Sequence, residues 1–129
     1  MAYDIGPKIG IEGEKEFKDA IKQINTTLKT LRTEMQVVVS EYDKNDKSAE
    51  ALTAQNEVLT KEIEAQKEKL DLLQKGLNSV KDEYGETSDV TQRWQQNVNR
   101  ATAELNDMER KLKDNSTAAA KASDDYKSA

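Results

Sequence analysis

The chain has 129 residues and a net charge of −5, with hydrophobic residues at 35%, charged residues at 35% and aromatic residues at 5%. This composition is too polar for a globule with a large core, and it is typical of long helices that bury a narrow apolar stripe. Acids and bases are interleaved without a basic patch, so we expect no nucleic-acid contact, and no apolar run approaches the roughly 18 residues of a membrane span.

The first predicted element, residues 1–13, is an extended N-terminal arm. It reads MAYDIGPKIGIEG and holds three of the five glycines and the only proline. Pro7 disfavours helical backbone at the residue before it, so the arm is not expected to be helical. Two alternatives stay open: a frayed terminus, or a strand added to the sheet edge of a partner.

The second predicted element, residues 14–114, is a coiled-coil helical region. From Phe17 to Leu112, positions separated by alternating steps of four and three residues are almost all apolar; we call this line of positions the seam. Its polar members are Asn45, Asn56, Gln66, Thr87 and Thr91, and none of its members is charged. A seven-residue apolar repeat of this length predicts a coiled coil.

The predicted coiled-coil interface consists of most of the seam. We expect Trp94 to be a core residue, with a recognition role as the alternative, and Asn56 either to set register or to be a tolerated polar residue. The predicted interface residues are Phe17, Ile21, Ile24, Leu28, Leu31, Met35, Val38, Leu52, Asn56, Leu59, Ile63, Leu70, Leu73, Leu77, Val80, Trp94, Val98, Leu105, Met108 and Leu112.

Two weak points interrupt the helical signal, near residues 43–48 and 85–88. The first is rich in Asp, Asn and Ser, which favour helix caps, and the second has Gly85 followed by Thr87, Ser88 and Asp89. Local chemistry therefore predicts three helices over about 14–43, 48–84 and 88–114. Because the seam crosses both points in register, we expect hinges in an extended rod, with antiparallel helical hairpins as the alternative.

The predicted fold class is all-α, with long helices in an extended coiled coil and a short N-terminal arm. A single amphipathic helix cannot bury its own stripe, so identical chains or another segment of the same chain must cover it. Leucine at the a positions with isoleucine or valine at d favours a parallel trimer. Residues 115–129 are alanine-rich and are expected to be a fraying helix or a linker.

The chain contains no histidine and no cysteine. The usual general base, thiolate nucleophile and transition-metal ligands are therefore missing, so we predict no catalytic, cofactor-binding or metal-binding residue and no enzyme activity. The acidic stretch DKNDKSAE lacks the spacing of a calcium loop.

Three stretches of sequence resemble the N-terminal region of phage tail tape measure proteins, of the type found in phages and prophages of Gram-positive bacteria. They are KIGIEGEKEFKDAIKQIN, YDKNDKSAEALTAQNEVLTKEIEAQKEKLDLL and YGETSDVTQRWQQNVNRATAELNDMERKL. The resemblance covers the chain to about Leu112. It rests on overall pattern and order, since none of the stretches is a catalytic motif.

The resemblance implies a virion structural protein that templates the length of the tail tube, occupies its lumen and leaves on DNA ejection. It implies the tail tube protein, tail terminator or tip proteins and tail assembly chaperones as partners. The expected location is the virion tail lumen, with the host cytoplasm during assembly. Family members are much longer, so we expect this chain to be part of a longer protein. The alternative function is a cellular coiled-coil adaptor or scaffold that binds partner helices.

Overall fold

The computed structural model describes residues 14–42 and 48–128, and it folds them into three long helices. They are α1 (Glu14–Glu41), α2 (Ala49–Tyr84) and α3 (Asp89–Ser128). The described residues contain no strand, so this part of the chain is all-helical as predicted. The predicted N-terminal arm and the seam position Asn45 lie outside the described residues.

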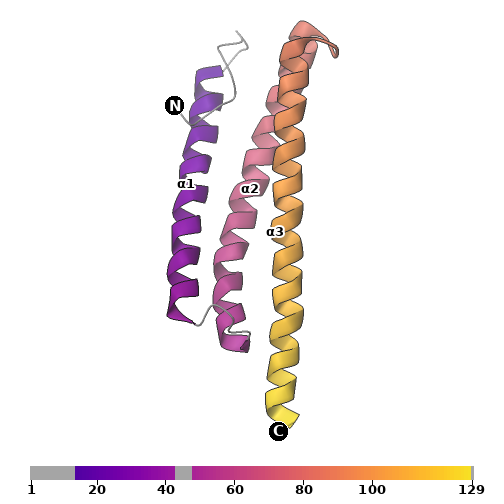
Figure 1. Cartoon of the computed structure of the whole chain (residues 1–129). Helices are drawn as coiled ribbons and strands as arrows, with labels where there is room; N and C mark the ends of the chain where they lie inside the picture. Colours follow the sequence, from indigo (N-terminus) through magenta and orange to yellow (C-terminus); the bar gives the residue numbers. More distant parts are fainter. Residues whose placement is uncertain (1–13, 43–47, 129) are drawn as a thin grey trace.

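The three helices run antiparallel to their neighbours in the chain. Figure 1 shows α2 between the other two, with α1 and α3 both descending while α2 rises. Helix α2 packs against both α1 and α3 along its length. The chain therefore folds back twice.

This arrangement corrects the expectation of an extended rod with hinges. The seam keeps its register across both weak points, but register alone does not decide whether a chain turns back, because a hairpin lets each helix orient its stripe independently. Folding back places the stripe of one helix directly against another helix of the same chain, without the loss of freedom that association with a second chain entails. The structure has the antiparallel hairpins that were the alternative.

The turn between α2 and α3 is fixed by caps at both helix ends. Gly85 ends α2 with φ 88° and ψ 160°, and its backbone N–H donates to the Lys81 carbonyl at 2.8 Å. Ser88 immediately precedes α3, and its hydroxyl accepts from the Thr91 backbone N–H at 3.1 Å. The Thr91 hydroxyl in turn donates to the Gly85 carbonyl at 2.7 Å. The predicted caps in this stretch are thus present.

The start of α2 is capped in the same way. The Ser48 side chain accepts a hydrogen bond from the Ala51 backbone N–H at 3.2 Å. At the same end of the molecule, α3 continues to Ser128, so the structure has a helix over residues 115–128, one of the two expectations for this stretch. Alanine has the strongest helix propensity of all residues, which accounts for this continuation.

Two hydrophobic clusters make up the core. One joins all three helices near the α2–α3 turn, with Ile21, Leu73, Leu77, Val80, Trp94, Val98 and Ala101 as its buried members. The other lies mainly between α1 and α2, with Ile24, Leu28, Leu31, Val58 and Ala65 as its buried members.

Candidate interhelical interface and groove

None of the predicted interface residues is exposed to solvent in the structure, since each is buried or half-buried. They face other helices of the same chain. The buried ones are Ile21, Ile24, Leu28, Leu31, Leu52, Leu59, Ile63, Leu73, Leu77, Val80, Trp94, Val98 and Leu105. The half-buried ones are Phe17, Met35, Val38, Asn56, Leu70, Met108 and Leu112.

Helix α2 carries a second apolar stripe that the sequence analysis did not single out. Its members are Ala51, Val58, Ala65 and Leu72, which recur every seven residues and lie outside the seam. Val58, Ala65 and Leu72 belong to the cluster that packs with Ile24, Leu28 and Leu31 of α1. This stripe is why α2 can lie between two helices, and its seven-residue spacing was the signal that could have predicted it.

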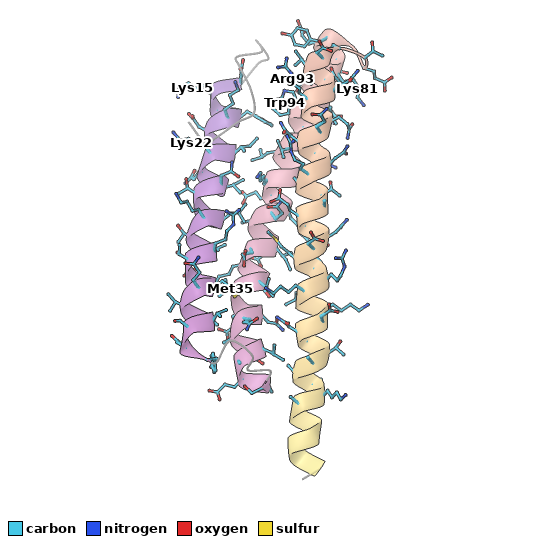
Figure 2. The ribbon with its side chains drawn as sticks, viewed as in Figure 1. Lys15, Lys22, Met35, Lys81, Arg93 and Trp94 are labelled. Atoms are coloured by element: carbon cyan, nitrogen blue, oxygen red, sulfur yellow. The ribbon has the colours of Figure 1, made fainter. Side chains whose placement is uncertain are left out.

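A junction of two aromatic rings over a glycine ties the three helices together. The rings of Phe17 on α1 and Trp94 on α3 lie 5.5 Å apart between centroids, tilted by 57°. Both rings press on Gly76 of α2, where an added Cβ would lie 2.7 Å from Trp94 Cη2 and 2.8 Å from Phe17 Cζ. Trp94 is 1% exposed and lies near the α2–α3 turn (Figure 2), so it is a core residue. We call Phe17, Gly76 and Trp94 the aromatic junction.

Buried polar groups fix the register between α2 and α3. Gln66 is fully buried, and its Nε2 donates to the Ala101 carbonyl at 3.0 Å. Nearer the other end of the hairpin, Asn56 Nδ2 donates to Ser116 Oγ at 3.1 Å. A slip of one helix along the other would leave the buried Gln66 donor unpaired, which costs about 1–3 kcal/mol, whereas the Asn56 bond is exposed and contributes less.

An open groove runs between α1 and α3, with α2 as its floor. Its volume is about 400 Å³, and it is lined by Arg32, Met35, Gln36, Leu59, Glu62, Asp107, Met108 and Lys111. Three of these side chains are apolar: Met35 from α1 (Figure 2), Leu59 from α2 and Met108 from α3. The groove therefore has an apolar lining from every helix and a charged rim.

Two ionisable side chains of α2 are perturbed along this side of the molecule. Glu62 is 8% exposed, and burial raises the pKa of its carboxyl, an effect that the charges of Lys111 and Arg32 partly offset. Burial lowers the pKa of Lys69, while Glu104 of α3 raises it and Arg32 lowers it further. Uncharged forms of both groups are favoured relative to the unfolded chain.

Two charge contacts link α2 and α3 of the same chain. Lys67 Nζ of α2 lies 3.9 Å from Glu109 Oε2 of α3. Glu104 of α3 lies near enough to Lys69 of α2 to raise its pKa. The antiparallel arrangement thus brings these two acids of α3 near bases of α2.

Within the part of the chain that the structure describes, no group of three or more acidic, histidine or cysteine side chains is placed to hold a metal ion. Among the described helices, none combines the length and apolar character that crossing a membrane requires.

Comparisons with known proteins add no family to this description. No protein-family model matches the chain, and neither a curated protein nor a solved structure is significantly similar to it.

Proposed function

We propose that the chain is a structural, non-catalytic component of a phage tail, the N-terminal part of a tape measure protein that sets tail-tube length, occupies the tube lumen and leaves on DNA ejection. The proposal is carried by the order of the three tape-measure-like stretches along the sequence. Its support from the structure is that the described chain is built entirely of long helices with charged outer faces. Such a body can lie in a tube without a strong attachment to the wall.

Because the chain folds back on itself, its length in space is not the length of one continuous helix, and this changes how it could set the length of a tail tube. A straight helix rises about 1.5 Å per residue, so the longest helix, with 40 residues, spans roughly 60 Å. The folded segment is therefore much shorter than its chain length. We propose that it acts as a compact helical module, and that length is encoded by segments elsewhere in the longer protein.

The proposed partners are further copies of the chain, the tail tube protein, tail terminator or tip proteins, and tail assembly chaperones. Within the proposal the helices pack as a coiled coil, and the leucine and isoleucine pattern of the seam, which favours three strands, is met by the three helices of one chain. The proposed location is the tail lumen of the virion, after assembly in the host cytoplasm.

The test is the composition and structure of purified tails from particles whose genome encodes this chain. We expect mass spectrometry to find its peptides in the tails and cryo-electron microscopy to show helical density on the tube axis. Removing the gene should abolish tails or give tails of uncontrolled length. Tails that lack the chain, or that keep their length without the gene, would rule the proposal out.

The second candidate function is an adaptor that binds a helix of another protein, and the open groove is the observation that favours it. Met35, Leu59 and Met108 form an adaptable apolar surface, since methionine fills irregular gaps. Methyl NMR of Met35 and Met108 on adding a candidate partner helix would test it, because binding in the groove must shift both signals.

A further inference from the structure

The α2–α3 turn holds a backbone conformation that only glycine adopts readily. Gly85 has φ 88° and ψ 160°, in a region that is costly for any residue with a Cβ. An added Cβ at Gly85 would meet no atom within 4 Å. The requirement for glycine is thus purely one of backbone conformation, and it exists only while the chain turns back at this point.

The seam passes through this turn without losing its phase. On either side it includes Val80 and Trp94, which are both buried between helices, and within the turn region it includes Tyr84, Thr87 and Thr91. A hairpin does not require this continuity. If residues 85–88 became helical, α2 and α3 would form one helix with their buried faces on a single continuous stripe.

We propose that the α2–α3 hairpin can open into one continuous helix and that two copies of the chain then exchange α3. In the exchanged dimer each α3 packs on the α2 of the other copy, in the same antiparallel direction. The contacts that hold the hairpin, such as Gln66 Nε2 to the Ala101 carbonyl and Asn56 Nδ2 to Ser116 Oγ, are then made between copies. Such an exchange of an identical element is a low-cost route to a dimer.

The two forms differ almost entirely at the turn. The closed form keeps the hydrogen bond from the Thr91 hydroxyl to the Gly85 carbonyl. The open form replaces it with helical hydrogen bonds through residues 85–88, and it can bury more of the Tyr84 ring, which is 43% exposed in the closed form. High protein concentration favours the dimer by mass action, and a residue other than glycine at position 85 favours it by straining the closed turn.

Two single-cysteine proteins test the exchange, because the chain has no cysteine of its own. Gln55 and Asn115 face each other across the hairpin, with Asn115 Nδ2 donating to Gln55 Oε1 at 3.5 Å. One protein carries Gln55→Cys and the other Asn115→Cys. They are unfolded together at high concentration, refolded, and treated with a short bismaleimide cross-linker. Only exchange between chains brings the two cysteines together.

The experiment compares the native turn with a Gly85→Ala turn in both proteins. We expect Gly85→Ala to shift the equilibrium toward the cross-linked dimer by about tenfold or more. In a matched control, two glycines inserted after Glu86 should suppress the cross-link, because a flexible turn does not continue the helix. A monomeric Gly85→Ala protein, or a dimer without the cross-link, would overturn the proposal.

A loss of helical circular dichroism in Gly85→Ala would also count against the exchange, since the open form has at least as much helix as the closed one. The two single-cysteine proteins with the native Gly85 turn provide the second test. If they give no cross-link after refolding together at high concentration, exchange is excluded. The exchange is argued from the turn and the seam and not from a tail function. The exchange can therefore fail while the tail function holds, and the tail function can fail while the exchange holds.

Discussion

At the scale of single residues, Gly76 is the position on which the contact of all three helices depends. Glycine in the middle of a helix costs about 1 kcal/mol relative to alanine. Here it admits the rings of Phe17 and Trp94, both of which would lie within 3 Å of an added Cβ. The sequence predicted Trp94 as a core residue, but it did not show that a glycine on another helix makes room for it.

Gly76→Ala should therefore destabilise the fold despite its better helix propensity. Overpacking costs about 1–3 kcal/mol, and two rings within 3 Å place this change in the upper part of that range. Helix propensity offsets about 1 kcal/mol, so we expect a net loss of roughly 1–2 kcal/mol in urea unfolding. The control is Asn78→Ala, an exposed change on the same helix that should be neutral or slightly stabilising. Equal stability of Gly76→Ala and the parent chain would show that the aromatic junction is not packed as described.

Glu62 makes the stability of the fold depend on pH, because burial raises the folded-state pKa of its carboxyl. A raised folded-state pKa means that protonation favours the folded form, so the stability due to this group is present at acid pH and is lost as pH rises through that pKa. Glu62→Gln should thus raise the melting temperature at pH 7, and the gain should shrink toward pH 4. The same substitution at exposed Glu64 is the control and should have little effect at either pH. A gain at position 62 that is constant with pH would contradict the burial of its charge.

Gln66 makes a different kind of polar contact with the core. Its Nε2 is bonded to the Ala101 carbonyl, but its Oε1 is buried with no hydrogen-bond partner among the described residues. Gln66→Met keeps the length of the side chain and removes that unpaired oxygen, so we expect denaturant unfolding to show a gain of up to about 1 kcal/mol. Gln66→Ala should instead lose stability because it leaves a cavity, and a stabilising alanine would refute the buried placement.

At the scale of elements, the caps account for where the helices begin and end. Ser48, Gly85 and Ser88 stand at the ends of α2 and α3, within a residue or two of the predicted limits. These boundaries could be predicted because capping is local chemistry, decided by the residues nearest each end. For residues 115–129 the sequence left a fraying helix and a linker open, because the seam ends at Leu112 while helix propensity continues through the alanines; in the structure α3 runs on to Ser128.

Ser88→Ala should weaken the start of α3 and, with it, the turn. The Ser88 hydroxyl accepts from the Thr91 backbone N–H and also donates to Thr91 Oγ1 at 2.8 Å, so its loss loosens the group that bonds to Gly85. We expect a cost of about 1–2 kcal/mol, at the upper end for an N-cap, measured by thermal unfolding. Ser79→Ala, at an exposed mid-helix position, is the control and should not lower the melting temperature. Similar melting temperatures for both variants would contradict the capping role.

At the scale of the whole molecule, the seam was right about which residues avoid water, and it left open whether copies of the chain or its own segments cover them. In the structure, segments of the same chain cover them. Ile24, Leu28 and Leu31 of α1 pack on the second stripe of α2. Ile21 of α1 instead joins the seam residues of α2 and α3 near the turn. A seven-residue repeat says that a stripe must be covered but not whether another chain or the same chain covers it. The sequence signal for folding back is that α2 carries two apolar stripes, because a helix with two such stripes must be covered on both sides. The second stripe consists of Ala51, Val58, Ala65 and Leu72.

The distance between α2 and α3 within one chain tests the central claim, that the seam is covered by the chain folding back on itself. Lys67 and Glu109, whose charged atoms lie 3.9 Å apart, are each replaced by cysteine and spin-labelled. The labelled chains are diluted with unlabelled protein at low concentration, so that only distances within one chain are measured. Double electron–electron resonance should give a short distance, since packed helix axes lie about 8–10 Å apart. A distance near 60 Å, roughly what the same residues would have along a straight helix, would contradict the account.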